Sequence, residues 1–180
     1  MKNSQKIILK SLEDTKKVAK EIANELETYI KTKSLIIFLK GELGSGKTTL
    51  TKEILKRLGI HEPVTSPTFT IIEPYSIKNK KIYHMDLYRI ENRKELEVLG
   101  IEEYLNENES MIFVEWPEKG GDFFNYCDLE LKLNHVDENS RELIYKNFKL
   151  LNVENNILVC FNRCSLESSL NSSEPKYRKV

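Results

Sequence analysis

The chain has 180 residues, a hydrophobic fraction of 39% and a formal net charge of zero. This length suits one domain, or one domain with a tail, and the absence of a long apolar run excludes a transmembrane helix. The near-neutral charge, without a basic patch that carries interleaved aromatic residues, gives no support to direct capture of nucleic acid.

The first sixty residues alternate short apolar runs with amphipathic stretches. They predict two strand–helix pairs: a strand at 7–9, a helix behind Ser11, a strand at 35–39 and a helix at 49–58. Ser11, with Asp14 three residues later, resembles an acidic variant of the capping box that begins a helix. Gly59 predicts the end of the second helix.

The middle of the chain predicts a loop, a hairpin and a broken helix. Two prolines predict that residues 63–70 start as an extended loop rather than as a helix. Apolar pairs around a polar turn at 76–81 predict a hairpin over 71–83. Helical material follows over 93–105, interrupted at Gly100.

The last part of the chain is rich in strand-like segments. The nearly unbroken apolar run 111–115 ends in an acid and predicts a buried parallel strand. Further strands are predicted at 129–134, at 143–150 and, on a weaker pattern, at 157–161. The polar end of the chain, residues 165–180, is expected to be disordered.

A glycine-rich segment between the predicted strand 35–39 and the helix behind it carries the chemistry. Residues 41–49, Gly-Glu-Leu-Gly-Ser-Gly-Lys-Thr-Thr, match the complete G-x-x-x-x-G-K-[ST] pattern. The free backbone N–H groups and the helix dipole of such a loop favour a diphosphate. Lys47 would reach the β- and γ-phosphates and the Thr48 hydroxyl would bind Mg²⁺, so the chain is expected to bind a nucleoside triphosphate.

These segments together predict an α/β fold, namely a P-loop NTPase-like three-layer α/β/α domain with a mixed, mainly parallel sheet. The domain is expected over residues 6–151. Residues 152–180 would form a C-terminal extension that is partly disordered.

Two acids are candidates for the second half of the nucleotide site. Glu115 ends the run 111–115, and Asp86 follows the strand-like Ile82-Tyr83. A carboxylate at the carboxyl end of a parallel strand lies on the same sheet edge as the phosphate loop, where it can hold Mg²⁺ directly or through water. Each could instead be an ordinary capping or surface acid.

Motifs that are absent from the sequence argue against some classes of nucleotide-binding enzyme. A guanine-reading [NT]-K-x-D segment is absent, and Asp86 does not begin a D-x-x-G switch, which argues against a GTPase. A small-molecule kinase usually places several arginines around the moving phosphoryl group. Here only Arg89 stands beside a site motif, so the kinase stays an alternative without support. A nucleotide-gated scaffold that need not hydrolyse ATP is a second alternative.

Four blocks of the sequence resemble the TsaE (YjeE) family of bacterial P-loop ATPases, and they occur in the family's order. They are the loop 41–49, Ser-Pro-Thr-Phe-Thr at 66–70, His-Met-Asp-Leu-Tyr-Arg at 84–89 and Glu-Trp-Pro-Glu-Lys at 115–119. Residues 95–101 also look like the family. The resemblance runs from about Lys6 to Leu150. Glu42 stands where the family commonly has Asp.

The resemblance implies an ATPase that binds ATP and Mg²⁺ and hydrolyses ATP weakly by itself. It would be needed for N6-threonylcarbamoyladenosine formation in tRNAs that read ANN codons. Its partners would be TsaD, the transferase, and TsaB, while TsaC makes the threonylcarbamoyl-adenylate. The ATPase cycle would reset the complex for multiple turnovers, and tRNA would be contacted only through the complex.

The resemblance also assigns roles to individual residues. Thr48 and Glu115 would hold Mg²⁺, and Asp86 would orient the metal or the attacking water. The catalytic residues would be Asp86, Lys47 and Glu115. The nucleotide would be bound by the following residues: Thr15, Leu43, Gly44, Ser45, Gly46, Lys47, Thr48 and Thr49.

Two further parts of the family pattern, the residues 66–69 and Trp116, have broader interpretations. Residues 66–69 look like a switch loop that responds to the γ-phosphate. Trp116 would be either core packing or part of a nucleotide-dependent surface.

Cysteine usage and charge placement add further expectations. Cys127, Cys160 and Cys164 are an odd set without a C-x-x-C pair, so free thiols are expected rather than a zinc site. Basic residues prevail over 1–60, whereas acidic residues prevail over 91–122, which could face a basic partner or be a solvated helix face. No apolar signal-peptide core follows the first six residues, so we expect a cytoplasmic protein that contacts no membrane.

Overall fold

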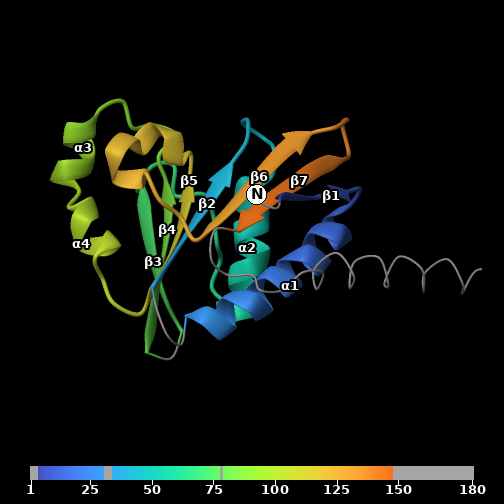
Figure 1. Cartoon of the computed structure of the whole chain (residues 1–180), viewed down its shortest axis with the longest axis horizontal. Helices are drawn as coiled ribbons and strands as arrows, with labels where there is room; N and C mark the ends of the chain where they lie inside the picture. The colour runs from blue at the N-terminus through green and yellow to red at the C-terminus, as the bar shows by residue number, and fades with distance from the viewer. Residues whose placement is uncertain (1–3, 31–33, 78, 148–180) are drawn as a thin grey trace, which may run out of the picture.

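The computed structural model describes residues 4–30, 34–77 and 79–147 (Figure 1). The strands are β1 (Ser4–Leu9), β2 (Leu35–Lys40), β3 (Ile72–Ile77), β4 (Lys80–Asp86), β5 (Ser110–Glu115), β6 (Leu129–His135) and β7 (Arg141–Asn147). The helices are α1 (Leu12–Tyr29), α2 (Lys47–Leu58), α3 (Arg93–Val98) and α4 (Ile101–Leu105), with a 3₁₀ segment, η1 (Pro117–Phe124).

The seven described strands form one mixed sheet in the order β1-β7-β6-β2-β5-β4-β3. Its centre is parallel, because β2 pairs in parallel with β5 and β6, and β4 pairs in parallel with β5. Both edges are antiparallel, through the β1–β7, β6–β7 and β3–β4 ladders. The predicted α/β fold with a mixed sheet is confirmed, and its parallel pairings are confined to the four central strands.

Helices cover both faces of the sheet and make three layers (Figure 1). Strand β5 shows how one strand serves both layers, because successive side chains point to opposite faces. Met111 and Phe113 join the core beneath α1 and α2. Ile112 and Val114 join the core beneath α3, α4 and η1. All of β5 is buried, which explains its continuous apolar sequence.

The start of α1 agrees with the predicted cap in all but one contact. The Ser11 side chain accepts a hydrogen bond from the Asp14 backbone N–H at 3.1 Å. The Asp14 carboxylate accepts from the backbone N–H of Lys10, one residue before the cap, rather than from that of Ser11. Gly59 ends α2 in a left-handed conformation, as predicted.

The middle and last segments match in type and differ in length. The hairpin strands are longer than predicted, because β3 extends to Ile77 and β4 begins at Lys80. Both ends lie inside the segment 76–81 that was predicted to be the turn. The predicted helical stretch 93–105 is two helices separated by Gly100. The 3₁₀ segment η1 was not predicted. The described part of β7 ends at Asn147.

Several predictions fall on parts of the chain that the structure leaves undescribed. These are the strand at 157–161, the disordered end and the extension at 152–180, together with Cys160 and Cys164. Cys127 is a buried thiol that forms no disulfide with another described residue, as expected. Among the described helices, none is long and apolar enough to cross a membrane.

Candidate nucleotide-binding site

The phosphate loop links β2 to α2 at the carboxyl edge of the parallel strands. Gly41 has a φ of 138°, and a Cβ atom there would lie 2.2 Å from the carbonyl oxygen of Leu133 on β6. Only glycine lets the loop turn this close to the neighbouring strand. Gly46 precedes α2 with a φ of 101° and supplies no capping side chain. The first N–H groups of α2 therefore remain available to an anion.

A cavity of about 350 Å³ opens at this point of the fold. It is lined by the phosphate loop, the loop 63–70 and the residues that end or follow β4 and β5. The lining residues are Leu43, Gly44, Gly46, Lys47, Thr48, Thr49, Ser66, Thr68, Asp86, Tyr88, Glu115 and Trp116. This volume is within the range of small-ligand sites.

Lys47 is the cation of the cavity. Its Nζ donates to the carbonyl oxygens of Gly41 and Glu42, both at 2.9 Å, and lies 4.1 Å from the centre of the Trp116 ring. Burial lowers the pKa of Lys47, while the carboxylates of Glu115, Asp86 and Glu118 oppose this shift by favouring the charged form. The buried ammonium group can attract an anionic ligand, whereas the three acids around it would attract a cation. The site therefore suits an anionic ligand that binds together with a cation.

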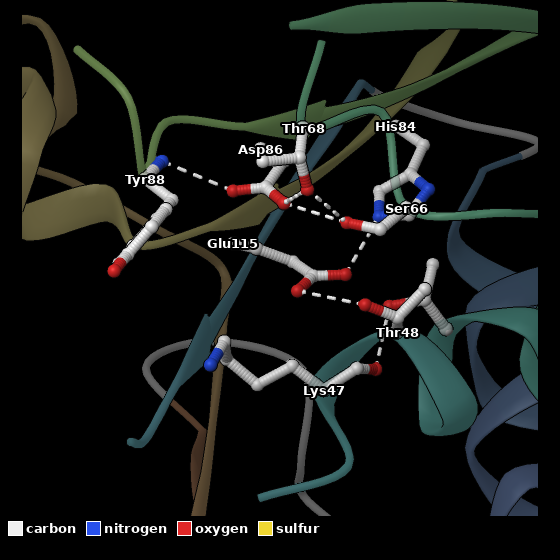
Figure 2. Close-up of polar contacts among 9 residues, drawn as sticks. Lys47, Thr48, Ser66, Thr68, His84, Asp86, Tyr88 and Glu115 are labelled. Atoms are coloured by element: carbon white, nitrogen blue, oxygen red, sulfur yellow. Dashed lines mark hydrogen bonds and ion pairs between the residues drawn. The ribbon is translucent and has the colours of Figure 1, made fainter. Parts of the chain in front are cut away.

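The side-chain oxygen atoms of Glu115 and Thr48 meet at the N-terminal end of α2 (Figure 2). The Thr48 hydroxyl donates to Oε2 of Glu115 at 3.1 Å. The other carboxylate oxygen, Oε1, lies 2.9 Å from Nε2 of His84. Glu115 is only 2% exposed, so burial and two hydrogen bonds hold its carboxylate in one orientation.

Asp86 binds the loop 63–70 through the side chains of two of its residues (Figure 2). Its Oδ2 accepts hydrogen bonds from Ser66 at 2.6 Å and from Thr68 at 2.7 Å. Its Oδ1 accepts from the backbone N–H of Tyr88 at 3.0 Å. Short bonds from hydroxyl groups to a carboxylate are among the stronger hydrogen bonds in proteins, so Asp86 anchors this loop to the sheet.

The loop that Asp86 anchors carries an exposed aromatic residue. Phe69 follows Thr68 directly, and its side chain is 80% exposed. The guanidinium carbon of Arg89 lies 4.1 Å from the centre of its ring, a cation–π contact. Arg89 therefore stacks on the loop surface and is not among the residues that line the cavity.

The residues present fit Mg²⁺ held together with a nucleotide. Thr48 and Glu115 offer two hard oxygen ligands, whereas within the described parts of the chain no group of three or more His, Cys, Asp or Glu residues could hold a metal ion. Mg²⁺ usually takes one or two protein ligands, and phosphate oxygens and water complete its shell. The donor set is therefore that of a metal–nucleotide site rather than an all-protein cage.

Comparison with known proteins agrees with this geometry. Residues 9–143 match the family described as "Threonylcarbamoyl adenosine biosynthesis protein TsaE". The chain belongs to the TsaE family. The match includes the phosphate loop, the loop 63–70 and the ends of β4 and β5, so every segment that lines the cavity lies within the part that defines the family.

Individual TsaE relatives support the same assignment. The chain is 42% identical over 106 residues to tRNA threonylcarbamoyladenosine biosynthesis protein TsaE of Haemophilus influenzae, which covers 59% of this chain and 66% of that protein. It is 38% identical over 145 residues to the Aquifex aeolicus protein of the same name, covering 79% and 96%. A crystal structure of Bacillus subtilis YdiB superposes with a TM-score of 0.64 at 26% identity, covering 96% of this chain and 99% of that one.

The structure brings most of the TsaE-like site residues together, and two of them are not among the residues that line the cavity. The cavity contains the predicted Lys47, Thr48, Asp86 and Glu115 together with the glycines of the loop. Ser45 is buried and does not line it. Thr15 lies in the first turn of α1, where its hydroxyl donates to the Ser11 carbonyl at 3.3 Å, and it does not line the cavity either. The roles of all these residues stay predictions.

Three residues of the TsaE site were missed or left open by sequence reasoning. No role was predicted for His84. It lies two residues before Asp86, so the alternation of side chains along a strand puts both residues on the same face of β4. Tyr88 lines the cavity and its ring lies 5.1 Å from that of Trp116. Trp116 packs against the core beneath α3 and also lines the cavity, and the dependence of its surface on nucleotide stays a prediction.

Proposed function

We propose that this chain is a Mg²⁺-dependent ATPase subunit required for N6-threonylcarbamoyladenosine formation in tRNA, acting with TsaD and TsaB. The observation that carries the proposal is the meeting of Lys47, Thr48, Asp86 and Glu115 around one cavity. In a chain of the TsaE family this meeting supports the proposal, because a phosphate-loop lysine and threonine with two neighbouring carboxylates are groups suited to binding ATP and positioning its γ-phosphate. The cytoplasm is the expected compartment.

Different residues of the cavity would bind the phosphate groups and the Mg²⁺ ion. Lys47 would exchange its contacts with the loop carbonyls for the β- and γ-phosphates, assisted by the free N–H groups at the start of α2. Thr48 and Glu115 would hold Mg²⁺, which neutralises charge on the phosphate oxygens when it is bound. The buried Glu115 carboxylate is already oriented by its hydrogen bonds, so little reorganisation is needed there.

Asp86 is suited to coupling between the γ-phosphate and the loop 63–70. Its carboxylate holds the hydroxyl groups of Ser66 and Thr68 and lines the same cavity as Lys47. A water that donates to this carboxylate, or a phosphate oxygen that accepts from the Ser66 and Thr68 hydroxyl groups in its place, would loosen the loop and change the surface that carries Phe69. Partner proteins that bind this surface would thereby regulate turnover, and hydrolysis by the chain alone would be weak.

Reconstituted threonylcarbamoyl transfer tests the proposal. TsaB, TsaD, TsaC and ANN-decoding tRNA are supplied with the substrates of TsaC, and product is counted over several turnovers with this chain added or omitted. We expect multiple turnovers only with the chain and ATP present, and we expect the Lys47→Ala variant to behave as an omission. Equal multiple-turnover yields with and without the chain would overturn the proposal.

The two alternatives predict different outcomes of simple assays. A small-molecule kinase would transfer phosphate to a metabolite pool, yet among the described residues that line the cavity there is no arginine to neutralise a moving phosphoryl group. A nucleotide-gated scaffold would support normal modification with a Glu115→Gln variant that binds ATP and cannot hydrolyse it. We expect this variant to be defective in repeated turnover.

A further inference from the structure

A buried histidine contacts the proposed metal-binding acid from the side opposite Thr48. His84 is 0% exposed, and its Nε2 lies 2.9 Å from Oε1 of Glu115 (Figure 2). The two residues come from the neighbouring parallel strands β4 and β5. His84 itself is too deeply buried to reach a ligand in the cavity, which Glu115 lines and His84 does not.

The chemistry of the pair fixes which group donates. An ionised carboxylate can only accept hydrogen bonds, so Nε2 carries the proton and donates to Glu115. The other ring nitrogen, Nδ1, is buried and has no hydrogen-bond partner among the described residues. A neutral ring protonated at Nε2 leaves Nδ1 as an unpaired acceptor, whereas a charged ring would leave a buried N–H unpaired.

We propose that His84 is a positioning residue that sets the metal-binding orientation of Glu115; this rests on the proposed binding of Mg²⁺ and nucleotide in the cavity. The donor at Oε1 holds one edge of the carboxylate, so that Oε2 faces the Thr48 hydroxyl at 3.1 Å. Without it, a carboxylate whose side chain is almost fully buried would lose one of its two hydrogen bonds and could rotate away from Thr48.

The effect on metal affinity of a residue that orients a metal ligand by a hydrogen bond is known in magnitude. Removal of such a residue commonly weakens metal affinity by about 10- to 100-fold. A histidine that only filled core volume would affect folding and leave the metal dependence of ligand binding unchanged. Metal dependence is therefore the property that separates the two roles.

The test compares substitutions that keep or remove the donor at the Nε2 position. The amide nitrogen of Gln reaches about as far as Nε2, that of Asn reaches only as far as Nδ1, and Leu has no donor. The purified full chain is titrated with the fluorescent nucleotide mant-ADP, once in EDTA and once over a series of Mg²⁺ concentrations. Melting temperatures in EDTA identify any variant that does not fold.

We expect His84→Leu and His84→Asn to need about 10- to 100-fold more Mg²⁺ for half-maximal tightening of mant-ADP binding. In EDTA they should bind mant-ADP as the wild type does, and His84→Gln should keep most of the wild-type Mg²⁺ dependence. If His84→Leu does not fold, the comparison of Asn with Gln decides.

Two results would overturn the inference. One is a folded Asn or Leu variant with the Mg²⁺ dependence of the wild type, and the other is an equal loss of mant-ADP affinity in EDTA and in Mg²⁺. Failure of the wild type itself to bind mant-ADP in a Mg²⁺-dependent way would instead contradict the proposed function. The two failures are therefore distinguishable.

Discussion

The Ser66 hydroxyl lies 2.6 Å from Oδ2 of Asp86 and joins the loop 63–70 to the end of β4. Thr68 reaches the same oxygen at 2.7 Å, and the two hydroxyl groups lie 2.8 Å apart. One carboxylate thus organises a loop whose next residue, Phe69, is largely exposed. Removal of the carboxylate should release the loop without disturbing the core.

Chymotrypsin, which cuts after aromatic residues, can measure this release at Phe69. Each hydrogen bond to a charged group contributes about 1.5–3 kcal/mol, so Asp86→Ala should speed cleavage after Phe69 by at least about 10-fold. Thr70→Ala is the matched control, because the exposed Thr70 lies in the same loop and bonds Glu73 rather than Asp86. Similar cleavage of both variants would show that Asp86 does not hold the loop.

Substitution of Lys47 should impair nucleotide binding, whereas substitution of Asp86 should mainly impair hydrolysis. Lys47→Ala removes the only lysine that lines the described cavity, so we expect mant-ATP affinity to fall by about 100-fold or more. Asp86→Ala should change affinity by only a few-fold and slow hydrolysis by about 100-fold. Equilibrium fluorescence and single-turnover hydrolysis measure the two effects. Equal loss of affinity in both variants would mean that Asp86 is a binding residue.

Gly41 should be the least replaceable glycine of the phosphate loop for stability. Gly41→Ala combines a positive φ with a Cβ only 2.2 Å from the Leu133 carbonyl oxygen, and we expect it to lower the free energy of unfolding by about 3 kcal/mol or more. Gly59→Ala has a similar positive φ and no neighbour within 4 Å, so about 1 kcal/mol is expected. Urea unfolding gives both values, and equal costs would contradict the role of the close contact.

Tyr145 should make the fold sensitive to alkaline pH. Burial raises the pKa of Tyr145 to about 12, from 10.0, and nearby Glu25 acts in the same direction. Since the unfolded chain ionises first, the contribution is complete below pH 10 and is lost as the pH rises to about 12. Tyr145→Phe should reduce this loss by on the order of 1 kcal/mol, after allowance for solvent screening.

Urea unfolding of wild type and Tyr145→Phe at pH 9, 10 and 11 measures that difference. Tyr126 offers an independent comparison, because burial and its hydrogen bond to Asp128 raise its pKa to about 12 as well. A double Phe variant should therefore lose less stability with pH than either single variant. Identical slopes for wild type and double variant would show that neither hydroxyl is protected in the folded state.

The parts of the fold that the sequence predicted are those with a local cause. The apolar run of β5 and the glycines of the phosphate loop each fix their own conformation, so their strand and turn were predictable. The antiparallel β3–β4 edge was predictable as a hairpin, whereas the β1–β7 edge was not, because its pairing depends on residues more than 130 positions apart in the chain. The 3₁₀ segment η1 also had no periodic pattern, and Trp116 before it adopts a left-handed conformation with a φ of 57°.

The site was predictable to the same extent. Thr48, Asp86 and Glu115 stand in recognisable motifs, so their meeting at one sheet edge could be expected. The contact between His84 and Glu115 could not, because it depends on the register that sets Asp86 opposite Glu115 across the β4–β5 ladder. Motifs name the residues of a site, whereas strand register decides which of them touch.

The β1–β7 ladder also determines how the domain would respond to mechanical force. Its register sets Ser4 opposite Lys146, so the outer ends of both strands lie at the same end of the ladder. A pull between these ends acts along the interstrand hydrogen bonds, which would open one after another like a zipper instead of resisting together in shear. The phosphate loop follows β2, which β7 and β6 separate from β1, so the first strand to peel away is remote from the nucleotide site.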